Sequence, residues 1–247
     1  MTAARLLAAA DEALIEAGFR TGRFEQADRL ALAAYDRAGR ERDEPRRAAA
    51  ANVLGYVLHY RNIAKLMDGL APEPDDVTAE RERFAEALAA YERLRNEAGI
   101  ARAAFGLGLL EQVLHRDWDA AMPYYRRSES LIPALEAADD LYTRSEIHRH
   151  LGFYHLVADK QPATAVEHLR ISLDLREQQG EPRRVPSGLV ALGWAERENG
   201  NPRRAVVLLR RAVELARAQG LSPARIADAE QGLSAAEAAL AEPEAGA

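Results

Sequence analysis

The stretch IHRHLGFYH, residues 147–155, holds three of the six histidines in this 247-residue chain, together with one arginine and two aromatic residues. Histidine can bind a metal ion or transfer a proton near neutral pH. On a helix, side chains three, four and seven positions apart share a face, so His148 and His150 point in nearly opposite directions and cannot chelate one ion together. The spacing therefore predicts two stripes: Glu146, Arg149, His150 and Phe153 on one, and His148, Leu151 and His155 on the other.

The first stripe is the candidate for chemistry. Glu146 and His150 lie four residues apart and could hold a metal ion if other helices supplied more ligands. His59 is the one obvious third ligand, and the sequence contains no HExxH motif. We therefore expect no metal and no cofactor, with a hydrogen-bonded Glu146–His150 pair that orients Arg149 as the alternative. The histidines of the second stripe are expected to be partly buried and structural, packed toward a partner helix.

Composition favours a helical protein. Apolar residues make up 48% of the chain, charged residues 29% and aromatic residues only 6%, with an excess of Ala, Leu, Arg and Glu. The absence of cysteine excludes disulfides, thiolate metal sites and cysteine nucleophiles. The net charge of −6 argues against a general nucleic-acid or anionic-membrane binder, and no apolar run approaches the length of a membrane span. Since Asp11 and Glu12 interrupt the first apolar run, we expect a cytoplasmic, all-α protein without a signal peptide.

The chain repeats itself. Four helix-periodic segments carry a Leu-Gly pair, at Leu54-Gly55, Leu107-Gly108, Leu151-Gly152 and Leu192-Gly193. Each is followed by a second helical segment in which an alanine precedes a bulky residue by four positions: Ala87 and Tyr91, Ala120 and Tyr124, Ala165 and Leu169, Ala205 and Leu209. A glycine inside a helix costs about 1 kcal/mol relative to alanine. Four of them in register therefore predict a close approach between paired helices.

These features resemble the tetratricopeptide repeat (TPR) family. The best match is residues 188–220, whose Leu192-Gly193, Gly200-Asn201 turn, Ala205, Leu209 and Ala212 fall at the family's positions. The Leu-Gly pairs are 53, 44 and 41 residues apart, longer than the ordinary repeat of about 34 and similar to long-repeat bacterial arrays. The resemblance covers roughly residues 1–220. It implies an α-α superhelix of about five helix pairs in one domain, residues 1–241, with a capping helix over residues 223–241 and a flexible tail, residues 242–247.

In such arrays the first helix of each pair lines a concave groove. Counting from each glycine, the predicted groove residues are Asn52, Tyr56, His59, Arg102, Phe105, Gln112, Glu146, Arg149, His150, Phe153, Trp194 and Arg197. Bulky aromatic residues on a solvated face indicate a binding site. The alternative is that a short array buries some of these aromatic residues as core.

Two classes of function follow. The first is a non-catalytic scaffold whose groove binds a peptide or a helix of a partner protein, with arginines meeting carboxylates. The second is a small-molecule binder or enzyme, in which the long hairpin of residues 46–97 closes over the groove and His150 or His59 transfers a proton. No catalytic motif is recognised, so no catalytic residue is predicted. The same hairpin could instead form a homodimer contact.

Overall fold

The computed structural model describes residues 1–241. Every regular element within this range is helical, so the predicted all-α class is confirmed for the described residues. The chain divides into two compact units, residues 1–139 and residues 140–247. The prediction of one domain over residues 1–241 stays a prediction, and the predicted tail, residues 242–247, lies outside the described residues.

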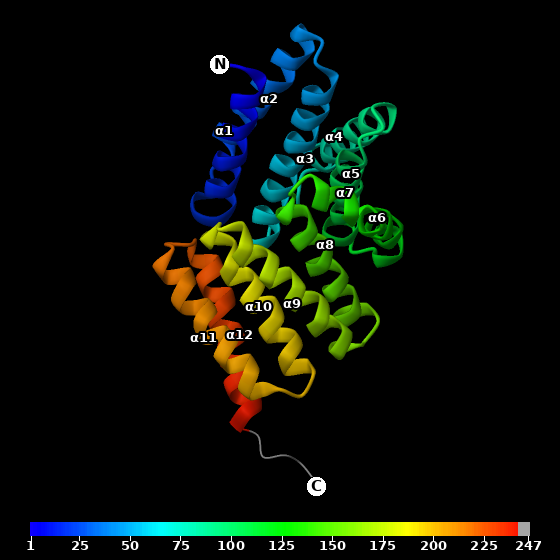
Figure 1. The fold of residues 1–247 in the computed structure, drawn as a ribbon. Coiled ribbons are helices and arrows are strands. Elements are labelled where there is room, and N and C mark those ends of the chain that lie inside the picture. Colours follow the sequence, from blue (N-terminus) through cyan, green and yellow to red (C-terminus); the bar gives the residue numbers. More distant parts are fainter. Residues whose placement is uncertain (242–247) are drawn as a thin grey trace. The chain divides into compact units, whose positions relative to one another are not determined.

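The first unit is a series of helices in which each one packs on the next along the chain (Figure 1). Its elements are α1 (Ala3–Glu16) with a π-helical turn η1 (Ala17–Thr21), α2 (Glu25–Glu41), α3 (Glu44–Met67), α4 (Pro74–Arg93), α5 (Glu97–Leu109) with a π-helical turn η2 (Leu110–Leu114), α6 (Trp118–Ser130) and α7 (Ile132–Ala137). Helices α3 and α4 have 24 and 20 residues, so this pair is long, as the sequence predicts. Its role as a flap or a dimer contact stays a prediction.

The second unit repeats the same pattern. Its elements are α8 (Leu141–Phe153) with a π-helical turn η3 (Tyr154–Ala158), α9 (Pro162–Gln179), a 3₁₀ turn η4 (Pro182–Arg184), α10 (Val185–Glu198), α11 (Pro202–Ala218) and α12 (Pro223–Ala241). Helix α12 has the predicted bounds and packs on both α10 and α11. Consecutive helices therefore pack together in this unit as well.

Side chains at the helix ends explain where many of these elements begin. Asp43 accepts a hydrogen bond from the backbone N–H of Arg46 at 3.1 Å and starts α3. Asn96, Asp117 and Asp140 cap α5, α6 and α8 in the same way. Gly180 and Gly220 end α9 and α11 with positive φ, at 73° and 61°. Gly99, in contrast, lies in the first turn of α5 and packs against the Tyr91 ring.

The four Leu-Gly pairs mark close contacts between paired helices. A Cβ atom built on the glycine would lie 2.5–2.7 Å from a bulky side chain of the following helix. The four contacts are Gly55 with Phe84, Gly108 with Tyr125, Gly152 with Leu169 and Gly193 with Leu209. No ordinary Cβ contact is that short. The close approach predicted from the glycines is therefore confirmed.

The π-helical turns change the spacing between glycine and alanine. Where no such turn intervenes, Gly193 precedes the buried Ala205 by 12 positions. Across η3, Gly152 precedes the buried Ala165 by 13 positions. The prediction that Ala120 and Tyr124 pack at the glycine is therefore wrong by one position. Ala121 and Tyr125 are the buried residues, because η2 adds one residue to the helix before the chain turns.

We expect Gly55→Ala to destabilise the protein by about 2 kcal/mol, because the new methyl group would overlap the buried Phe84 ring. Gly39→Ala is the matched control, since Gly39 is also helical and nothing lies near its added Cβ. It should stabilise the protein by about 0.5 kcal/mol through helix propensity. Urea denaturation measures both changes, and equal effects at the two positions would contradict the steric explanation.

Candidate functional site

The predicted groove residues of the first unit are mostly core. Phe105 is fully buried, with its ring 5.5 Å from that of Tyr125. Tyr56 is also buried and meets Phe84 edge to face at 5.2 Å. Both aromatic residues therefore belong to the core, which the sequence left open as the alternative to a binding surface. Asn52 and His59 are buried too, whereas Arg102 and Gln112 are half-buried.

His59 takes part in a buried polar cluster. Its Nδ1 atom lies 2.7 Å from Oε1 of Glu80, which is fully buried on α4. Asn62 donates a hydrogen bond to Oε2 of the same carboxylate at 2.9 Å. Sequence reasoning missed Glu80, although it falls in the buried stripe of α4 with Phe84, Ala87 and Tyr91. The signal in the sequence was an acidic residue at helical spacing from the apolar residues that are buried. The cluster joins α3 to α4 inside the first unit.

The second unit brings the six remaining groove residues together. Glu146, Arg149, His150 and Phe153 lie on α8, and Trp194 and Arg197 lie on α10. The ring centroids of His150 and Phe153 are 6.2 Å apart, and those of Phe153 and Trp194 are 5.8 Å apart. Trp194 is 39% exposed. An aromatic row thus runs from α8 to α10, and its α10 end is open to solvent.

Arg149 is held beside this row by two contacts. Its Nη1 atom donates a hydrogen bond of 2.8 Å to the backbone carbonyl of Ser187 at the start of α10. Its guanidinium carbon lies 4.8 Å from the centre of the Phe153 ring, which is a cation–π geometry. The expected Glu146–His150 hydrogen bond is not what orients it, because Nε2 of His150 lies 3.9 Å from the Glu146 carboxylate. Packing on α10 positions Arg149 instead.

Two further arginines lie behind the row, and sequence reasoning missed both. Arg176 on α9 forms a buried ion pair with Glu146 and donates to the Ser187 hydroxyl at 2.6 Å. Arg184, in η4, places its guanidinium carbon 3.7 Å from the centre of the Tyr142 ring. The signal for Arg176 was its position in the buried stripe of α9, three residues after Leu173. Both arginines were overlooked because the predicted groove contains only residues from the first helix of each pair.

Positive charges surround the buried Glu146 carboxylate. Burial alone would raise the pKa of Glu146, but the positive charges of Arg176 and Arg149 outweigh burial and lower it. Glu146 is therefore ionised at neutral pH. The guanidinium groups of Arg149, Arg176 and Arg184 all contribute to the lowering.

The second histidine stripe faces α9, as predicted. Nδ1 of His148 lies 3.1 Å from Nδ1 of His168, and the rings of His155 and His168 stack at 5.4 Å. Burial, followed by the charges of His168 and Arg144, lowers the pKa of His148 to about 4. These histidines join α8 and η3 to α9. Across residues 1–241, no three side chains of the metal-binding types converge on a possible ion site.

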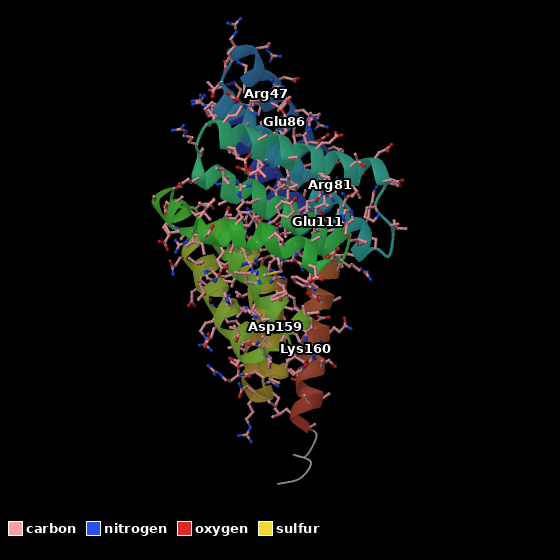
Figure 2. All side chains as sticks on the ribbon, turned by 90° about the vertical axis from the view of Figure 1, so that its right-hand side faces the viewer. Arg47, Arg81, Glu86, Glu111, Asp159 and Lys160 are labelled. Carbon is pink, nitrogen blue, oxygen red and sulfur yellow. The ribbon has the colours of Figure 1, made fainter. Side chains whose placement is uncertain are left out.

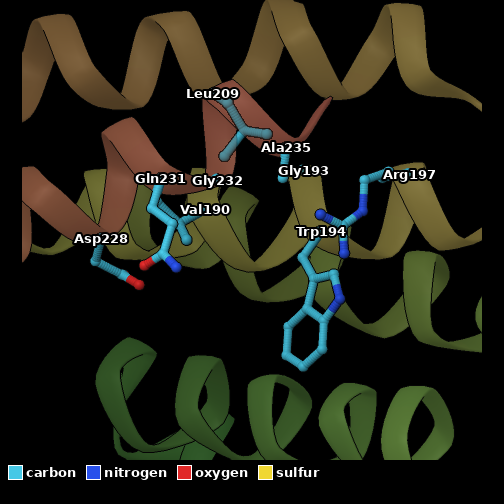
Figure 3. A pocket seen from close by; sticks show the side chains of 9 residues that line it. All are labelled: Val190, Gly193, Trp194, Arg197, Leu209, Asp228, Gln231, Gly232 and Ala235. Atoms are coloured by element: carbon cyan, nitrogen blue, oxygen red, sulfur yellow. The ribbon is translucent and has the colours of Figure 1, made fainter. Parts of the chain in front are cut away.

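Two surface cavities differ in charge. One, of about 380 Å³, lies between α2, α3 and α4, and ion pairs such as Arg93–Glu44 and Arg47–Glu86 surround it. Figure 2 labels Arg47 and Glu86, together with Arg81 and Glu111, a second pair of this unit that is 2.8 Å apart. The other cavity, of about 230 Å³, lies between α10, α11 and α12 and includes Trp194 and Arg197 (Figure 3). The first cavity is lined by paired charges, whereas the second is mainly apolar.

Comparison with protein-family models and with curated proteins finds no match for this sequence. Within residues 1–241, no helix combines the length and the apolar character needed to cross a membrane.

The free energy of unfolding should depend on pH through His148. As pH falls, the unfolded chain binds a proton at this imidazole near pH 6.5, whereas the folded chain binds it only near pH 4. The stability that neutral His148 contributes is therefore fully present above pH 6.5. This contribution is lost as the pH falls from 6.5 to 4, by about 2 kcal/mol after allowance for partial exposure. Urea denaturation at pH values from about 7 to about 4.5 measures how the unfolding free energy changes with pH. His148→Gln should remove the part of this change that His148 causes. Glu146 is present in the wild type and in the variant, so its own effect on stability cancels in the comparison. An equal change of unfolding free energy with pH in both proteins would contradict the assignment to His148.

Proposed function

We propose that this chain is a TPR-like interaction module that binds an acidic peptide segment of a partner protein. In this proposal the helices form an α-α superhelix of about five pairs, with α12 as its cap. The pairwise packing and the four glycine contacts support it. The cytoplasmic location, the bacterial origin and a homodimer stay predictions from the sequence.

The observation that carries the proposal is the aromatic row, open to solvent at Trp194, beside the fixed Arg149 side chain. Trp194 and Phe153 offer apolar area, and large aromatic residues next to arginine are typical of the residues that dominate binding energy. The Arg149 guanidinium beside them offers a charged partner for a carboxylate. A segment with an acidic side chain beside an apolar one would match both features.

Preorganisation adds to the affinity expected here. The Arg149 guanidinium is already held by the Ser187 carbonyl and by the Phe153 ring. A fixed side chain loses little conformational entropy when a ligand binds, so more of the interaction energy appears as affinity. A flexible surface arginine would not offer this advantage.

Catalysis in the same groove has less support. His59 is buried against Glu80 in the first unit, away from solvent. Glu146 is held in its ionised form by arginines, so it is a poor proton donor at neutral pH. Of the two histidines proposed from the sequence for proton transfer, His150 alone stays a candidate.

The test is selection of peptides from a random display library with the wild-type protein, followed by affinity measurements with variants. Selected peptides should pair Asp or Glu with an apolar neighbour. Arg149→Gln and Trp194→Ala should each weaken their binding at least about tenfold, or about 1.4 kcal/mol.

Two matched controls lie on α11. Arg203 is an exposed arginine, and Val207 is an exposed apolar residue, 69% accessible. Arg203→Gln and Val207→Ala should bind the peptides like the wild type. Peptides that bind the Arg149 and Trp194 variants with unchanged affinity would refute the proposed surface.

A further inference from the structure

We propose that the cavity between α10, α11 and α12 is a binding site for a small organic monocation, a primary ammonium group joined to an apolar body. This inference goes beyond the partner-binding function. The two sites share Trp194, but the side chains that decide the ligand here, Asp228 and Gln231, are not part of the peptide surface. Its components are an apolar back wall, an open indole and an acidic rim, all within the second unit (Figure 3).

The back wall of the cavity is rigid. Leu209 of α11 is held between two glycines, because a Cβ on Gly193 would lie 2.7 Å from its Cγ atom and a Cβ on Gly232 would lie 2.9 Å from its Cδ2 atom. Val190 and Ala235 complete the apolar lining. The volume of about 230 Å³ exceeds the roughly 150 Å³ of an engineered cavity that binds benzene. One aromatic ring with a short chain therefore fits.

One side of the cavity is formed by Trp194. Its indole is 39% exposed, and indole is the aromatic ring that attracts cations most strongly. Figure 3 shows Trp194 and Arg197 on one side of the cavity and Asp228 and Gln231 on the other. A ligand in the cavity would contact the indole along its apolar body or with its charged end.

The rim decides the charge of the ligand. Asp228 is exposed on α12, and it forms no hydrogen bond or ion pair with any residue of the described part of the chain. Arg197, the cationic residue of the lining, donates two hydrogen bonds, of 3.1 and 2.7 Å, to Oε1 of Glu198. Its charge is offset by that carboxylate. The rim therefore has an unmatched negative charge, which favours a cation.

The type of cation follows from the acceptors. Asp228 and Gln231 lie three residues apart on α12, so their side chains share a face of the helix. Carboxylate and amide oxygens accept hydrogen bonds, and a primary ammonium group has three N–H donors. A quaternary ammonium would leave these acceptors without donors. The same chemistry is carried by a free amine and by a lysine side chain of a peptide.

The test uses a Trp118→Phe background, in which Trp194 is the one tryptophan that can report by fluorescence. 2-Phenylethylamine should change the emission saturably. The neutral isostere 2-phenylethanol should bind at least about tenfold more weakly, because it lacks the charge that Asp228 attracts. Nα-acetyl-lysine methylamide, titrated in parallel, distinguishes the sources: tighter binding than 2-phenylethylamine assigns the site to peptide lysines, and weaker binding assigns it to free amines.

Variants assign the site. Asp228→Asn should weaken amine binding about tenfold, to the level of the alcohol. Glu230→Gln is the matched control, since it removes the same charge from α12 at a carboxylate paired with Arg217, and it should have no effect. Ala235→Leu should block both ligands by filling the cavity, with circular dichroism to check folding.

Three outcomes would overturn the proposal: no saturable response to either amine up to about 10 mM, a limit weaker than any useful affinity; equal binding of amine and alcohol; or an unchanged amine affinity in Asp228→Asn. Because Asp228 and Ala235 lie outside the surface proposed for peptides, their variants leave the peptide test unaffected. Failure of one proposal is thus distinguishable from failure of the other.

Discussion

The contact between a helix glycine and a bulky side chain of the next helix sets the geometry of both units. It brings each pair of helices closer than any side chain at the glycine would permit. The residue after each glycine is thereby turned to another side of its helix. In the second unit these residues are Phe153 and Trp194, the two rings of the aromatic row. In the first unit the corresponding Tyr56 is buried against Phe84, so the same rule leads to core packing there.

Much of this arrangement could be predicted from the sequence, because it depends on local periodicity. The helices, the close contacts at the glycines and the separation of His148 from His150 all follow from 3.6 residues per turn. The position of Tyr125 could not be predicted, since nothing in LLEQVL marks the extra residue of η2. The burial of Phe105 against Tyr125 could not be predicted either, because it depends on packing between helices and not on local periodicity.

Both units also bury charged or polar pairs between neighbouring helices. Glu80 meets His59 and Asn62 in the first unit, and Glu146 meets Arg176 in the second. Such pairs add little net stability, because removal from water costs about as much as the attraction returns. Breaking one is costly, since the remaining charge would be buried without its partner. They therefore select one alignment of the helices over shifted alternatives that apolar contacts alone would tolerate.

The π-helical turns have a consequence for how such a chain can evolve. A turn such as η2 or η3 holds one residue more than the α-helical path needs. The glycine before the turn still contacts the bulky side chain of the next helix in both cases. A single-residue insertion or deletion at these places alters the length of the chain without moving the core. Elsewhere in a helix the same event would rotate every following side chain by about 100°. The ends of α5 and α8 are thus positions at which gene-level insertions can be absorbed, and a lineage could gain or lose residues there while its binding surface stays intact.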